Sequence, residues 1–289
     1  MSHKFSLRKH ASGLLLSTAI LAYGCSPAPK EGEKTNKDSA ATATVSATPD
    51  TTLKEEKAED FFLSLPSPIH IAHLFKRAGL KYIDGLGSDP NNVSKYQSEF
   101  SSSLNTGVYT TDLAYATFNN KSQVSISYFK AVRTLGEKLN MASIFDKNGL
   151  LPRFEKNLNN QDSLVSIMSD MYMESDLLLK ETSRRDVVYL SFAGAWVESM
   201  YVATSLVSKE KNPVLVKRIV HQHLTLNKLI KLLEDYKDRP QVADLIAQLN
   251  EVKVTLDSLN ANKDNIDEAT FKKFSEQVKQ IRGKIIATV

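Results

Sequence analysis

The spacing of apolar positions along the chain predicts a helical protein. After residue 60, apolar side chains recur mostly at intervals of three and four residues, which places them on one face of an α-helix. No run alternates convincingly at a period of two, as a half-buried strand does. Only 11 glycines and 9 prolines occur in 289 residues, which also favours helices over many short strands. We therefore expect an all-α fold.

Residues 186–207, DVVYLSFAGAWVESMYVATSLV, are predicted to form the central helix of a bundle of about seven or eight helices. After Asp186 this stretch carries a single charge, Glu198. Its apolar side chains point in nearly every direction around a helix, so it is either wrapped by other helices or spans a membrane. A carboxylate in mid-span is costly in lipid, and Gly194 and several serines lower the hydrophobicity. These features favour the central helix.

One side of this helix carries small residues, among them Ser191, Gly194 and Ala195, together with Glu198. Small residues let a second helix approach closely, so we expect Glu198 to face a neighbouring helix rather than water.

Other helices are predicted from the same periodicity and from capping signals. Ser67 and Gly79 fit the two ends of a first helix. A loop with glycines and Asp89-Pro90 follows, and a second loop around Asp146–Pro152 separates two halves. Further helices are expected at about 92–119, at 122–140, from 162 or 163 onward, and at 213–236. Residues 239–289 are expected to form a helical hairpin packed on a core domain of residues 61–238, with Asn265 and Glu268 as a capping box between its helices.

The amino-terminal residues 1–24 have the three parts of a secretory signal. A basic beginning precedes an apolar run, Leu14–Ala22, and small residues then stand before a cysteine. The five residues that end at Cys25, LAYGC, resemble the lipobox of bacterial lipoproteins, in which the cysteine becomes the lipidated first residue. Cys25 is the only cysteine of the chain, so no intramolecular disulfide is possible, and acylation explains a lone thiol in an exported protein.

The lipobox resemblance implies a protein that is held at the membrane of a bacterial cell envelope by acyl chains such as palmitate on Cys25. By analogy with lipoprotein sorting, Ser26 after the cysteine indicates the outer membrane, with the protein facing the periplasm. Residues 25–60 are rich in Pro, Ala, Thr, Ser, Lys and Glu, which predicts a disordered tether between the lipidated cysteine and the helical core.

The charge balance argues against a nucleic-acid partner. The formal net charge is +4, but three of the 37 basic residues and none of the 33 acidic residues lie in residues 1–24. The remainder therefore carries a net charge of only about +1, and no basic face for nucleic acid follows from that balance.

Histidine, serine and glycine patterns give no strong sign of chemistry. His70 and His73 have a spacing that can share a metal, whereas His221 and His223 lie ~200° apart around a helix and cannot. The chain has no Gly-x-Ser-x-Gly elbow and no phosphate loop. We therefore expect neither a metal nor a cofactor.

Two acids are the better candidates for function. Asp112 and Glu198 both lie within apolar helical arcs, where ionisation is costly without a partner. If they converge, they can act as an acid–base pair or as the polar floor of a ligand pocket walled by aromatic side chains. The candidate walls are Tyr109, Tyr115, Trp196 and Tyr201. Alternatively, each carboxylate ties helices together through tyrosine hydroxyls, backbone groups or a Lys or Arg, or is simply exposed.

Two short patterns resemble a known family. Residues 105–115, NTGVYTTDLAY, and 194–201, GAWVESMY, resemble uncharacterised helical lipoproteins of Bacteroidota over roughly residues 65–235. This resemblance implies an outer-membrane lipoprotein without an established activity, and it transfers no catalytic residue.

Three functions remain open. The first is a non-enzymatic binding or scaffolding module that is anchored through Cys25 and acts with another envelope protein. The second is a small-ligand-binding domain with a pocket near Asp112 and Glu198. The third is a hydrolase, which needs these two carboxylates roughly 5–10 Å apart in an open cleft.

Overall fold

The computed structural model describes residues 81–147, 149–209 and 212–288, all within the compact unit Asp50–Val289. In these ranges every regular element is a helix and no strand occurs, which confirms the predicted all-α class. The predicted signal peptide, Cys25, the tether and the first helix with His70 and His73 lie outside the described residues.

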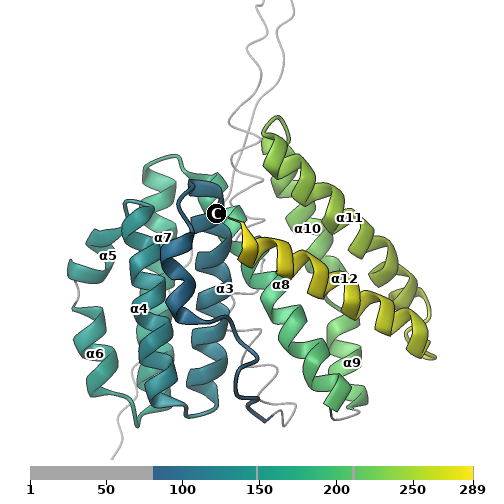
Figure 1. The fold of residues 1–289 in the computed structure, drawn as a ribbon, viewed down its shortest axis with the longest axis horizontal. Coiled ribbons are helices and arrows are strands. Elements are labelled where there is room, and N and C mark those ends of the chain that lie inside the picture. The colour runs from purple at the N-terminus through teal and green to yellow at the C-terminus, as the bar shows by residue number, and fades with distance from the viewer. Residues whose placement is uncertain (1–80, 148, 210–211, 289) are drawn as a thin grey trace, which may run out of the picture. The chain divides into compact units, whose positions relative to one another are not determined.

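Helix α8 (Arg185–Lys209) lies at the centre of the described helices, as predicted for residues 186–207. Helices α3, α7, α9, α10 and α12 all pack against it (Figure 1). Seventeen of its 25 residues are buried, and these face several neighbours rather than one. None of the helices that the structure describes combines the length and apolar character needed to cross a membrane.

Helices α3 (Glu99–Phe118) and α8 cross so closely that their backbones touch. A Cβ atom added to Gly107 would lie 1.8 Å from the backbone oxygen of Ser191, and one added to Gly194 would lie 1.9 Å from that of Leu104. No side chain fits at such distances, so this approach requires glycine on both helices. The strip of small residues on α8 therefore admits a close neighbour, as predicted.

Two hydrophobic clusters lie on either side of this crossing. One cluster contains Phe129, Phe154 and Met168. Its main helices besides α3 are α4 (Ser122–Lys138), α5 (Ala142–Lys147), α6 (Leu150–Lys156) and α7 (Gln161–Glu181). The other contains Leu226 and Phe274. Its main elements besides α8 are α9 (Pro213–Val220), α10 (His223–Leu233), η2 (Glu234–Tyr236), α11 (Pro240–Ala261) and α12 (Glu268–Ala287). Figure 1 shows the two groups of helices with α3 and α8 between them.

Several predicted helix boundaries are wrong for local reasons. The segment predicted at 92–119 is a short 3₁₀ helix, η1 (Pro90–Lys95), followed by α3. The break occurs because Ser98 and Ser101 form a capping box that starts α3. The loop predicted around 146–152 contains the end of α5 and the start of α6.

In the carboxyl-terminal half, two predicted helix boundaries also differ from those of the structure. The helix predicted at 213–236 is interrupted after Val220, whose carbonyl oxygen lies 3.0 Å from Nδ1 of His223. The cap of α12 is Asp267, which accepts a 2.7 Å hydrogen bond from the backbone N–H of Thr270. The predicted capping box of Asn265 and Glu268 is therefore misplaced by two residues.

Candidate functional site

The crossing of α3 and α8 brings Asp112 and Glu198 together, and neither residue has exposed surface. Burial raises the pKa of the Asp112 carboxyl well above its usual range, and the neighbouring Glu198 raises it further. Asp112 Oδ1 has no donor among the described residues. The raised pKa favours the neutral form of Asp112, so this carboxyl retains its proton to a higher pH than a free aspartate does.

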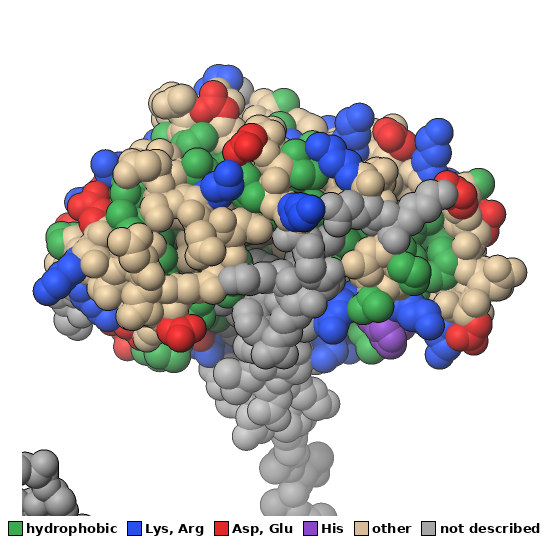
Figure 2. Space-filling view, turned by 90° about the horizontal axis from the view of Figure 1, so that it is seen from below, with side chains coloured by type: hydrophobic (Ala, Val, Ile, Leu, Met, Phe, Trp, Pro, Cys, Tyr) green, Lys and Arg blue, Asp and Glu red, His purple; other side chains and the backbone are tan. Residues whose placement is uncertain are grey.

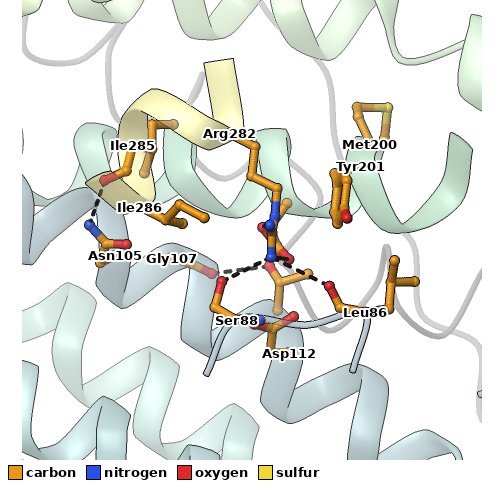
Figure 3. A network of polar contacts seen from close by, with 12 residues as sticks. Leu86, Ser88, Asn105, Gly107, Asp112, Met200, Tyr201, Arg282, Ile285 and Ile286 are labelled. Carbon is orange, nitrogen blue, oxygen red and sulfur yellow. Dashed lines mark hydrogen bonds and ion pairs between the residues drawn. The ribbon is translucent and has the colours of Figure 1, made fainter. Parts of the chain in front are cut away.

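Arg282 of α12 supplies the opposite charge. Its Nε lies 2.6 Å from Oε2 of Glu198 and its Nη2 lies 3.0 Å from Oε1, a two-point contact that fixes both groups. Nη2 also donates to Ser88 Oγ at 3.0 Å, and the guanidinium carbon lies 4.0 Å from the centre of the Tyr201 ring. Figure 3 shows Arg282 reaching from α12 toward Ser88 and Asp112. Three segments far apart in the sequence therefore meet at one ion pair.

The segment before η1 closes the remaining side of this network. The backbone N–H of Ser88 donates to Asp112 Oδ2 at 2.8 Å. A Cβ atom added to Gly87 would lie 2.4 Å from the Tyr128 hydroxyl and 2.8 Å from Asp112 Oδ1, so any larger residue there would displace both side chains. Thus backbone, rather than an open cleft, covers the Asp112 carboxyl.

Two of the predicted aromatic walls attach the same segment to α3. The Tyr109 hydroxyl donates to the Asp89 carbonyl at 2.8 Å. The Tyr115 hydroxyl donates to the Lys81 carbonyl at 3.1 Å and accepts from the Ile83 N–H at 2.9 Å. Tyr109 and Tyr115 therefore hold residues 81–89 against α3.

The other two predicted walls, Trp196 and Tyr201, have separate positions on α8. Tyr201 is half-buried and packs its ring on Arg282. Trp196 is fully buried, but helical geometry turns it ~200° away from Glu198. The structure thus brings Asp112, Glu198 and Tyr201 together around Arg282 and leaves Trp196 in the hydrophobic core.

Sequence reasoning missed Arg282 and Ser88. The one available signal for Arg282 was a base within the apolar stripe of α12, one residue after Ile281 and four after Val278. Ser88 had no such signal, because its backbone and hydroxyl contacts depend on how residues 81–89 fold back over α3.

The arrangement ties four parts of the chain together and presents no carboxyl group to solvent. A substrate reaches Asp112 or Glu198 only if Arg282 or the segment around Ser88 moves aside. Within the described ranges, no three His, Cys, Asp or Glu side chains are grouped closely enough to hold a metal ion.

Comparisons with known proteins return no similar chain: no protein-family model matches, and neither the curated proteins nor the solved structures give a significant match.

Proposed function

We propose that this protein is a lipid-anchored component of a bacterial cell envelope whose helical body binds or scaffolds other molecules. The observation that carries the proposal is Cys25, the only cysteine, which stands two residues after the apolar run Leu14–Ala22, behind Tyr23 and the small residue Gly24. Acylation of this thiol places the body at a membrane surface, because several acyl chains bind a bilayer far more stably than one. The outer membrane, with the body facing the periplasm, follows by analogy from Ser26. The resemblance to helical lipoproteins of Bacteroidota agrees with this placement.

A binding role, rather than catalysis, is supported by how the candidate acids are used. Both carboxyl groups have no exposed surface, and Glu198 is held by two hydrogen bonds from Arg282. This contact joins α8 to α12, and a ligand at the acids would first have to displace Arg282, which would leave Glu198 buried without a partner. Figure 2 shows basic and acidic side chains interspersed over one face of the molecule, a surface on which contacts of mixed charge are available.

The anchor is tested by metabolic labelling with radioactive palmitate and by membrane fractionation. Wild-type protein is expected to incorporate label and to sediment with outer membranes. Cys25→Ser should abolish both, whereas Ser26→Ala, next to it in the chain, should change neither. Label retained in Cys25→Ser contradicts the proposal.

The scaffolding role is tested separately, after extraction of wild-type protein in mild detergent. Sedimentation analysis should show a defined complex heavier than one chain. A chain that sediments alone at every concentration contradicts this part of the proposal.

A further inference from the structure

Helices α9 and α10 carry an exposed stripe of basic and apolar side chains, which we call the α9–α10 stripe. Its members recur at intervals of three and four residues: Val214, Lys217, His221, Leu224, Lys228 and Lys231. His221 and Gln222, which lie between the two helices, keep right-handed helical backbone angles, so the spacing continues from one helix into the next. Lys228 is half-buried and the other five side chains are exposed. The opposite side of the same segment packs into the hydrophobic cluster that contains Leu226 and Phe274.

Positive charge is concentrated on the segment that bears this stripe. Residues 212–233 contain four Lys or Arg residues, two His and no Asp or Glu. The chain after residue 24 has 34 basic and 33 acidic side chains, and removing the four basic ones leaves 30 against 33. A basic amphipathic helix is typical of a membrane surface or of a segment that binds an acidic protein. The charge pattern therefore indicates a negatively charged partner.

Two apolar side chains on the stripe favour a membrane over an acidic protein. Val214 and Leu224 are each 57% exposed and lie about 15 Å apart along the helix axis, with Lys217 and His221 between them. In Figure 2 hydrophobic and basic side chains surround a histidine. A helix that lies on a bilayer buries its apolar side chains about 5–10 Å into the boundary between head groups and acyl chains, while its lysines stay at the phosphates. Such a surface satisfies both kinds of side chain along the whole stripe.

A pocket of about 200 Å³ beside the stripe offers hydrogen-bond donors to a phosphate group. It is lined by Lys217, Val220, His221, Asn260, Lys263 and Asp264. The ammonium groups of Lys217 and Lys263 carry the charge opposite to that of a phosphate, and the side chains of Asn260 and His221 are further donors. Asp264 is the one acid in this lining. A lipid phosphate therefore fits between α9 and the end of α11.

We propose that the α9–α10 stripe is a second membrane contact, which lays the helical body on a bilayer that contains anionic phospholipids. Val214 and Leu224 enter the head-group region, and Lys217 and Lys263 contact lipid phosphates. The inference rests on the proposed membrane location and extends it, because it fixes which face of the body meets the lipid. One lipid anchor leaves the body free to turn, whereas an anchor together with a basic surface holds it in one orientation.

Nitroxide labels at two exposed valines test this contact. Val214→Cys lies on the stripe, and Val254→Cys on α11 is the matched control, because Val254 is 70% exposed and points about 120° around its helix from Asn260. The sample is the acylated full chain, in which Cys25 cannot react with the label, reconstituted in vesicles of phosphatidylethanolamine and phosphatidylglycerol. The label at Val214 should gain collisions with oxygen, which is concentrated in the bilayer, and lose collisions with a water-soluble nickel chelate. The label at Val254 should stay accessible to the chelate.

Lysine variants test the electrostatic part of the contact. Each lysine near an anionic surface strengthens binding about fivefold. In the labelled Val214→Cys chain, Lys217→Gln and Lys263→Gln should therefore each lower the ratio of bilayer-bound to free bodies about fivefold, as resolved from the two components of the nitroxide spectrum. Lys130→Gln, on the exposed face of α4, should leave the ratio unchanged. High salt and phosphatidylcholine vesicles should both reduce the protection of the label, because the first screens the negative charge and the second lacks it.

Two results would overturn the proposal: equal chelate accessibility at Val214 and Val254 on the anionic vesicles, or protection at Val214 that neither lysine variant weakens. Palmitate labelling of the same sample keeps this proposal and the anchor apart. Palmitate incorporation with an unprotected label at Val214 refutes the contact and leaves the anchor in place. If palmitate is not incorporated, the Cys25→Ser chain with the label at Val214 is mixed with the same vesicles. Protection of that label then supports the contact without the anchor, and its exposure refutes the contact.

Discussion

The ion pair between Arg282 and Glu198 is predicted to be the most sensitive single contact of the described body. Replacing Arg282 by Met leaves the Glu198 carboxylate buried without a partner, which should lower the free energy of unfolding by about 3–5 kcal/mol. Urea denaturation of the full chain measures this. Arg133→Met is the control, because Arg133 pairs with Glu137 and Asp146 at the surface and should change stability by less than about 1 kcal/mol. Equal effects for the two variants would contradict a structural role for Arg282.

The two acids of the pair are expected to respond differently to amide substitution. Glu198→Gln removes the charge that balances Arg282 and should cost about 3 kcal/mol or more. Asp112→Asn should cost much less, because the amide resembles a protonated carboxyl, accepting from Ser88 and donating to Glu198. Thermal unfolding of the two variants at neutral pH measures both losses of stability. A larger loss in Asp112→Asn than in Glu198→Gln would show that Asp112 carries the charge.

The pH dependence of stability provides a second test of the Asp112 proton. The pKa of Asp112 is raised in the folded state, so between pH ~4, where an unfolded aspartate titrates, and the folded pKa the native state binds more protons than the unfolded state. Stability from this group is therefore complete below pH ~4 and is lost as the pH rises. Relative to wild type, Asp112→Asn should flatten the decline in the unfolding free energy above pH 4. Parallel pH profiles for the two proteins would refute the raised pKa.

At the residue scale, the sequence predicts which acids are unusual but not what compensates them. Asp112 and Glu198 stand out because each interrupts an apolar helical arc, and that pattern is local. Arg282 lies 84 residues beyond Glu198, and Ser88 lies 24 residues before Asp112. Their roles depend on the packing of α12 and of residues 81–89 against the bundle, which no short-range spacing encodes.

At the scale of the elements, the crossing of α3 and α8 is predicted to tolerate no side chain at its two glycines. Gly107→Ala or Gly194→Ala places a Cβ atom against backbone oxygen, where no rotamer change relieves the clash, and should cost about 3 kcal/mol or more. Gly283→Ala on α12 is the matched control. Its Cβ meets nothing within 4 Å, so helix propensity should stabilise the protein by about 0.5–1 kcal/mol. Urea denaturation of the three variants measures these changes in the free energy of unfolding. If the alanine variants at Gly107 and Gly194 lose little stability, the two helices can move apart at little cost in free energy, and the prediction is wrong.

Helices were easier to predict than their ends. The 3.6-residue periodicity identified α4, α7, α11 and α12, because each buries a stripe of apolar side chains. Helix α8 was identified instead by apolar side chains on nearly every side. The breaks before α3 and between α9 and α10 coincide with side chains that bond to nearby backbone, namely Ser98 and His223. Such contacts compete with helical hydrogen bonds without disturbing the apolar pattern, so periodicity alone extends the helix through them.

At the scale of the whole described body, α3 and α8 are shared by both hydrophobic clusters. Tyr109 and Leu113 of α3 belong to the cluster with Phe129, while Leu104 and Val108 belong to the cluster with Phe274. Asn105 of α3 also donates to the Ile285 carbonyl of α12 at 3.1 Å (Figure 3). Neither cluster can therefore lose α3 or α8 without exposing part of the other, and we infer that the two clusters unfold as one unit.

This coupling predicts a single unfolding transition. Trp196, the only tryptophan, lies fully buried on α8 and reports on the centre, while far-UV circular dichroism reports on all helices. Urea curves from the two signals should coincide. Phe129→Leu and Phe274→Leu change one residue in each cluster. Each should lower the free energy of unfolding by about 1–2 kcal/mol, and the fluorescence and dichroism curves should give the same value. If Phe129→Leu shifts the dichroism curve but leaves the Trp196 curve in place, the clusters unfold separately, and the α3–α8 crossing joins two independent units rather than one core.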